Sequence, residues 1–305
     1  MKSVLPSRPL ATVEPAPDAP VAPFIAPAAP PPPRRLRAPR ALVGVPSALL
    51  ALVALAAAFP DLLAPHAPTD MDASAVLSAP GAGHWFGTDQ FGRDVLSLVI
   101  CGARQSVVIG VSSVLVGASV GVTLGLVAGY AGGLVDMVLM RVLDVWMAIP
   151  NILLAIALST ALGPSLSTTV FAVSVQAVPR YARVLRGQAI AVRGQPFIQA
   201  ARLAGASHFA ILRRHVLPHC AGTISVLATL GVGTAILIGA GLSFLGLGVN
   251  DERPDWGYLL TQGRGYLTVA WWTVTFPGLA LTALVVSVNL LGDGLRRRVR
   301  GASQR

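Results

Sequence analysis

Few residues in this chain of 305 have the types and spacing that metal binding or catalysis needs. His215 and His219 lie four residues apart, a spacing that places two imidazoles on one face of a helix, where they could share a metal ion. Pro218 is expected to interrupt that helix, and no third ligand has a suitable spacing. We therefore predict no metal site.

Nucleotide chemistry is also missing from the sequence. Lys2 is the only lysine, so the chain cannot contain the GxxxxGK[ST] loop that binds phosphates. If ATP drives this protein, another polypeptide must bind it. Cys101 and Cys220 lie at the edges of apolar runs and form no CxxC pair, which argues against a disulfide scaffold or a zinc site.

The composition indicates an all-α integral membrane protein in contact with lipid. Hydrophobic residues make up 54% of the chain and charged residues 12%, and the mean hydropathy is +0.68. A soluble protein of this length could not bury so much apolar surface in one or two cores. The net charge of +10 would suggest nucleic acid binding in a soluble domain, but here the basic residues mark loops.

Uncharged runs of about 20 residues match the hydrocarbon core of a bilayer. The longest run has Gly163, Pro164 and Ser165 in its middle and is expected to form two helices joined by a tight turn. We predict a transmembrane domain over residues 41–295. Its six helices are expected within 41–59, 105–135, 145–178 (two helices), 216–250 and 265–292.

The basic residues also predict the orientation, with both termini inside. In this arrangement 19 of the 23 Lys and Arg residues lie in cytoplasmic segments, whereas the outer loops hold eight acids and four arginines. Residues 1–40 hold 12 of the 24 prolines and are predicted to form a disordered, Pro/Ala-rich cytoplasmic tail. Residues 296–305 are predicted to form a basic cytoplasmic tail. The segment 186–218 is placed in the cytoplasm, and 61–94 and 249–264 outside.

Two patterns within the predicted spans suggest roles. Asp136, Arg141 and Asp144 lie near a cytoplasmic boundary, and we interpret them as a paired or snorkelling group rather than as a proton relay. Glycines recur every four residues along the second helix, which leaves a smooth stripe for close helix packing. We favour packing inside the bundle over a dimer interface for this stripe. Its members are Gly117, Gly121, Gly125 and Gly129.

The segment QAARLAGASHFAILRRHVLP, residues 199–218, resembles the EAA loop by which permeases of bacterial ABC importers dock onto their ATPase. A weaker likeness to a helix-turn-helix is discounted because the segment lies between two spans, so no nucleic acid partner is expected. Further motifs resemble the C-type permease subunit of dipeptide, oligopeptide and nickel ABC importers. They are HWFGTDQFGRDVLS (84–97), GARQS (102–106), LVAGYAGGLVDMVLMRVLD (126–144), LSFLGLG (242–248), DWGYLL (255–260), FPGLA (276–280) and NLLGDGLR (289–296).

This resemblance implies the type I importer fold and a non-catalytic, multi-pass subunit of the bacterial inner membrane. The implied partners are a B-type sister permease in a heterodimer, two ATPase subunits that bind ATP and Mg, and an extracytoplasmic solute-binding protein. The chain itself would hold no cofactor. An ion-coupled secondary transporter or channel is the alternative, and a membrane scaffold is a third; the absence of an acid near the middle of any span argues against ion coupling.

The resemblance also assigns roles within the loop. A short helix starting near Pro196 would lie against the ATPase, with Ala200 and Ala201 allowing close packing and Gly205 making a turn. Leu217 and Pro218 would end the loop. Two residues depart from the family pattern, because Gln199 replaces the usual acid and His215 the usual isoleucine.

Overall fold

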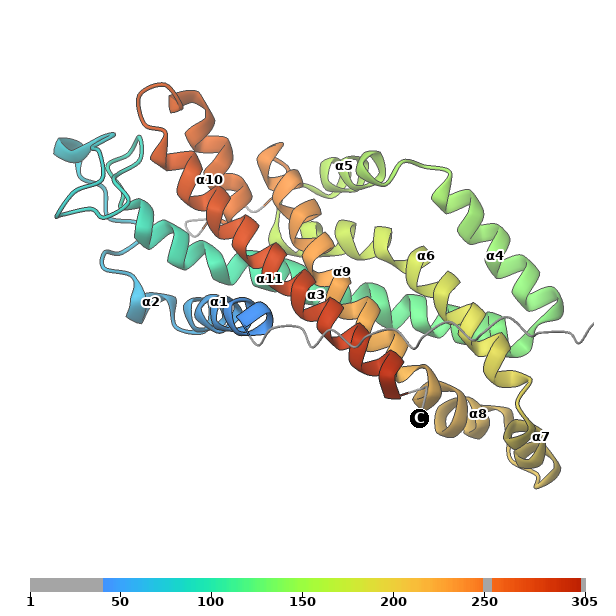
Figure 1. The fold of residues 1–305 in the computed structure, drawn as a ribbon. Helices are drawn as coiled ribbons and strands as arrows, with labels where there is room; N and C mark the ends of the chain where they lie inside the picture. The colour runs from blue at the N-terminus through green and yellow to red at the C-terminus, as the bar shows by residue number, and fades with distance from the viewer. Residues whose placement is uncertain (1–40, 249–253, 303–305) are drawn as a thin grey trace, which may run out of the picture. The chain divides into compact units, whose positions relative to one another are not determined.

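The computed structural model describes residues 41–248 and 254–302, in which every regular element is a helix. The predicted tail over 1–40 lies outside the described residues. The chain divides into two units, Met1–Ala38 and Pro39–Arg305, and all the helices belong to the second. The elements (Figure 1) are α1 (Ala41–Ala58), α2 (Pro60–Leu63), η1 (Ala73–Ala75), α3 (Val95–Ala131), α4 (Gly133–Met147), α5 (Asn151–Leu162), α6 (Leu166–Arg193), α7 (Pro196–Leu203), α8 (His208–Ile211), η2 (Leu212–Val216), α9 (Leu217–Phe244), α10 (Trp256–Gly263), η3 (Arg264–Tyr266) and α11 (Trp272–Ala302).

Three helical runs in the described chain are long and apolar enough to cross a bilayer. The first is α3, the second is the continuous run His208–Phe244, and the third is α11 as far as Arg297. The bent pair α4 and α5 is a fourth if the two helices together make one span. The described apolar part of α1, Gly44–Ala58, is shorter than these runs. The count of six spans and the orientation of the termini therefore stay predictions.

Several boundaries differ from those predicted. Asp94 caps α3 by accepting a hydrogen bond from the Ser97 N–H (2.8 Å), so this helix begins ten residues before Gln105. The turn at 163–165 lies where the sequence predicts it, but α6 continues past Val178 to Arg193. The helix predicted to follow residue 145 is instead broken before Asn151, where Pro150 cannot continue the hydrogen-bond ladder, and α4 and α5 meet at 82°. At the other end of the chain, α11 runs to Ala302, so the predicted basic tail begins as helix.

The glycine stripe of α3 lies against α6 of the same chain. A Cβ on Gly117 would come within 2.8 Å of the Ser174 carbonyl oxygen, and one on Gly121 within 2.5 Å of the Val178 oxygen. A Cβ on Gly125 or Gly129, one and two turns later, would lie equally close to the carbonyl oxygens of Ala182 and Arg186. The backbones of α3 and α6 therefore touch at four successive turns, which only glycine allows.

Buried polar contacts hold the segment before α3 against α11 and the first turns of α3 against α10. The indole N–H of Trp272 donates to the Thr88 carbonyl (2.9 Å), and that of Trp256 donates to the Val99 carbonyl (2.8 Å). Arg93 forms an ion pair with Asp89 (2.6 Å). Asp255 caps α10, and its burial raises its pKa to about 6. This end of the bundle is therefore closely packed.

Candidate functional site

The segment between α6 and α9 folds into two short helices joined by a glycine turn. Pro196 begins α7, where its missing N–H costs nothing because the first turn has no intrahelical acceptor for it. After α7 ends, Gly205 has φ +79°, the left-handed conformation that the sequence predicts for this turn. Ser207 then caps α8 by accepting from the Ala210 N–H (3.2 Å). Figure 1 shows α7 and α8 together at one end of the bundle.

One face of this segment is buried in the bundle. Ile198, Ile211 and Val216 are fully buried. They pack in one apolar cluster with residues of α3, α6 and α9, among them Leu126 and Leu185. The segment is therefore attached to three long helices by a continuous core.

Aromatic contacts add two specific links. The Tyr130 hydroxyl at the end of α3 hydrogen-bonds His208 Nδ1 (3.0 Å), and the Arg202 guanidinium lies 5.3 Å from the centre of the Tyr130 ring. Phe197 of α7 stacks on His219 of α9, with ring centroids 4.9 Å apart. A force on α7 thus has a direct route to both α3 and α9.

The opposite face is exposed and partly apolar. The side chains of Leu203 and Phe209 are 90% and 71% exposed, and Gln199 and Ala200 are exposed beside them. We call these four residues the outer loop face. Isolated exposed apolar residues are common on proteins, but two large ones within seven residues of one short segment suggest a docking surface.

One predicted loop residue takes a place other than the one expected. Ala201 is half-buried and packs against the apolar cluster beneath α7, so it faces the bundle. Leu217 and Pro218 are the first residues of α9, although Pro218 does not interrupt the helical backbone, which runs from His208 to Phe244. The π-helical turn η2, which includes His215, precedes Pro218 in this run. The helix between His215 and His219 is therefore intact, and His219 Nδ1 lies 3.1 Å from the His215 carbonyl oxygen.

The acids of α4 pair with arginines of α6. Arg186 donates to Asp136 (2.6 Å), and Arg183 donates to Asp144 (2.7 Å). Arg141 is exposed and does not pair with Asp144, contrary to the local grouping that the sequence suggests. The two carboxylates therefore neutralise the charges of two arginines in the second half of α6, which is less apolar than the first.

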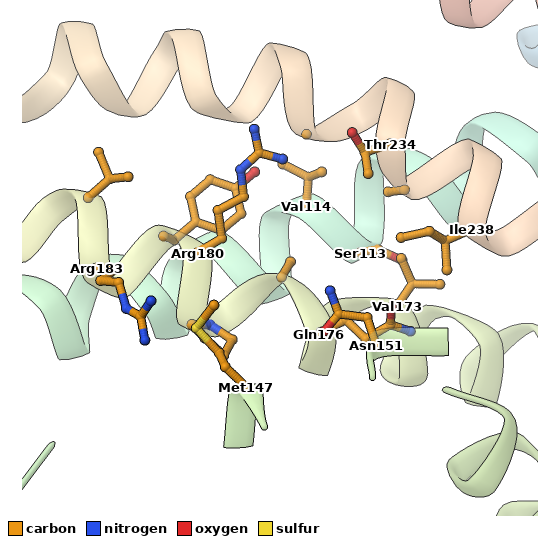
Figure 2. A pocket seen from close by; sticks show the side chains of 16 residues that line it. Ser113, Val114, Met147, Asn151, Val173, Gln176, Arg180, Arg183, Thr234 and Ile238 are labelled. Carbon is orange, nitrogen blue, oxygen red and sulfur yellow. The ribbon is translucent and has the colours of Figure 1, made fainter. Parts of the chain in front are cut away.

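A cavity of about 340 Å³ lies between α3, α6 and α9 and is bordered by the bend between α4 and α5. Its lining is mostly apolar, with a few polar side chains. Figure 2 shows Arg180 and Arg183 on one side of the opening and Gln176, Asn151 and Ser113 on the other. Sequence reasoning missed this cavity because its walls come from five segments that meet only in the fold.

Reasoning from the sequence also missed Leu203 and Phe209. Leu203 follows Ile198 by five residues, about 140° around the helix, so the two apolar side chains cannot both face the bundle. The sequence does not say which of them is buried, and the structure shows that it is Ile198.

Comparison with known proteins assigns the family. Residues 121–301 match the family described as binding-protein-dependent transport system inner membrane component. A probable D,D-dipeptide transport system permease protein of Escherichia coli is 40% identical over 248 residues, which is 81% of this chain and 83% of that protein. A dipeptide transport system permease protein of Alkalihalophilus pseudofirmus is 43% identical over 242 residues, 79% of this chain and 80% of that protein.

The fold has a counterpart among solved structures. An inward-facing structure of the MetNI methionine ABC transporter aligns with a TM-score of 0.54 at 20% identity, over 66% of this chain and 96% of that one. The chain therefore has the fold of a type I ABC importer permease, and it belongs to the inner membrane components of binding-protein-dependent transport systems, which are non-catalytic permease subunits.

Proposed function

We propose that this chain is one of two permease subunits of an ATP-driven importer of short peptides, and that it couples to an ATPase through residues 196–218. The observation that carries the coupling role is the outer loop face, which lies on a buried core shared with α3, α6 and α9. The peptide cargo is supported by the relatives named as dipeptide permeases, which match about four fifths of the chain.

The ion pairs between α4 and α6 favour this function over an ion-coupled transporter. A proton relay needs a carboxylate that can gain and lose its charge during transport. Asp136 and Asp144 are each already paired with an arginine of α6, so neither is an unpaired acid of that kind. ATP bound by partner subunits, with Mg, is then the energy source.

The chain alone is expected to be inactive. Uptake of radiolabelled alanyl-alanine into proteoliposomes should require this chain, a sister permease, two ATPase subunits, the binding protein and internal ATP. Omission of any one protein should reduce uptake to background. Uptake by the purified single chain in a proton or sodium gradient would contradict the proposal.

The proposed orientation places both termini and α7 in the cytoplasm and residues 61–94 outside. The variants Ser74→Cys and Ser207→Cys, each in a Cys101→Ala, Cys220→Ala background, should react with an impermeant maleimide from opposite sides of the membrane. Both serines are exposed, so the reagent can reach a cysteine at either position. The native cysteines are buried and are also replaced, so labelling reports only the side of the membrane on which the introduced cysteine lies. Labelling of both positions from one side would disprove the orientation.

A further inference from the structure

Two imidazoles lie beside one buried carboxylate at the start of α3. His84 Nδ1 is 3.0 Å from Asp94 Oδ1, and His66 Nδ1 is 3.8 Å from Asp94 Oδ2. The centroids of the two imidazole rings are 5.0 Å apart. Each of the three side chains offers one ligand atom, and these atoms all lie within 4.8 Å of one another. No other three His, Cys, Asp or Glu side chains are grouped so closely within residues 41–248 and 254–302.

The three side chains suit a divalent transition-metal ion, with Zn²⁺ as the best match. Zn²⁺ binds imidazole nitrogen and carboxylate oxygen at about 2.0–2.2 Å, so the ligand atoms of a tetrahedral site are about 3.3 Å apart. His84 and Asp94 already have this separation, and the widest pair would have to close by about 1.5 Å at most. Three protein ligands leave the fourth position to water.

Hydrogen bonds hold the carboxylate of Asp94 in place. The backbone N–H and the hydroxyl of Ser97 both donate to its Oδ2, at 2.8 and 2.7 Å. The backbone N–H of His66 in turn donates to Ser97 Oγ (3.1 Å), which ties the segment after α2 to the same group. Outer hydrogen bonds of this kind orient the ligands of metal sites. The carboxylate is therefore oriented by the fold itself.

The group is open to solvent on one side. The side chain of Asp94 is only 2% exposed, whereas those of His84 and His66 are 24% and 42% exposed. A hollow of about 330 Å³, lined by residues 61 and 64–69, borders His66. An ion can therefore enter past the imidazoles and meet the carboxylate at the base, and the exposed His66 has room to move towards it.

The local roles of these residues account for only part of the arrangement. Asp94 needs only Ser97 to cap α3, and a hydrogen bond is sufficient to explain the position of His84. At 3.8 Å, His66 Nδ1 is too far from the carboxylate for a hydrogen bond. An ion between them would bond to all three side chains.

We propose that His66, His84 and Asp94 bind Zn²⁺ or a divalent cation of similar preference, with water as the fourth ligand. The ion would fix the segment between α2 and α3 against the first turn of α3. This inference goes beyond the transport function and does not depend on the transported solute. It departs from the expectation of no metal site, because ligands 18 and 10 positions apart in the sequence meet only in the fold.

The test is isothermal titration of the purified full-length chain with Zn²⁺ in detergent, using an affinity tag without histidine. Wild type should bind about one Zn²⁺ per chain. Loss of an outer hydrogen bond weakens metal sites by 10- to 100-fold, so loss of a ligand in His66→Gln or His84→Gln should weaken binding by at least about 100-fold. Asp94→Asn should do the same and still cap α3, because asparagine caps helices as well as aspartate does.

The matched control is the double variant His215→Gln, His219→Gln. These histidines also lie one turn apart on an intact helix, but no carboxylate joins them in a group of three within the described chain. Their replacement should leave tight Zn²⁺ binding unchanged. In addition, Co²⁺ bound to the wild type should show the strong visible absorption of a tetrahedral site, and Co²⁺ added to His84→Gln should not.

Three results would overturn the inference. They are no stoichiometric Zn²⁺ binding by the wild type, wild-type affinity in both His66→Gln and His84→Gln, or loss of tight binding in the control variant. Gel filtration shows whether each variant is folded, and the two single histidine variants suffice for the test if Asp94→Asn aggregates. Since transport is not measured, none of these results bears on the proposed function.

Discussion

Replacing Leu203 with aspartate should separate the permease from its ATPase and reduce peptide uptake to background. Leu203, at the end of α7, is 90% exposed, so its replacement removes little packing inside this chain. Burial of a leucine contributes about 1.5–3 kcal/mol, and a carboxylate buried without a partner adds a further penalty. We therefore expect docking to weaken by at least about 100-fold, measured by co-purification of the ATPase with the tagged permease and by uptake in proteoliposomes.

The matched control is Leu62→Asp. Leu62 is 82% exposed on α2, a short helix in the segment placed outside, so the same chemical change there should leave ATPase binding intact. Leu203→Met, which keeps an apolar side chain of similar size, should retain most of the binding. Normal co-purification and uptake by Leu203→Asp would remove the outer loop face from the coupling mechanism.

Gly125→Leu should prevent accumulation of folded protein. Any Cβ at this position would overlap the backbone of Ala182, and a backbone cannot move aside as a flexible side chain can. Overpacking of this kind costs about 3 kcal/mol or more, although leucine is intrinsically a better helix former than glycine. The measurements are the yield of monodisperse protein and the temperature at which it aggregates in detergent.

Gly187→Leu is the control for this change. Gly187 is an exposed residue of α6, and a Cβ built there meets no atom within 4 Å. The leucine should be neutral or slightly stabilising at this site because it favours helix. An aggregation temperature for Gly125→Leu within a few degrees of the wild-type value would show that α3 and α6 separate easily.

The sequence predicts those features of this fold that depend on neighbouring residues. The turn at Gly163 to Ser165, the regular spacing of the α3 glycines and the positive φ of Gly205 all follow from local chemistry, and the structure has each of them. The all-helical membrane fold likewise follows from composition and the length of the apolar runs.

The features that the sequence does not predict depend on contacts between distant segments. Residues 179–193 read as a basic cytoplasmic stretch, yet they continue α6 because Asp136 and Asp144 of α4 pair with two of its arginines. Pro218 reads as a break, yet it is tolerated near the start of α9 after a π-helical turn. Which side of α7 is buried depends on the core beneath Ile198, which no pattern of eight residues specifies.

The contact between α3 and α6 has a mechanical consequence. Two backbones that interlock at four successive turns cannot slide or rotate past one another, so α3 and α6 form one stiff beam, and α3 alone is about 55 Å long. Near one end Tyr130 is tied to His208 beside α7, and near the other the Val99 carbonyl is tied to Trp256. We therefore expect a displacement applied at the α7 end to tilt α3 and α6 together, so that it reaches the opposite end of α3 as a rigid-body movement.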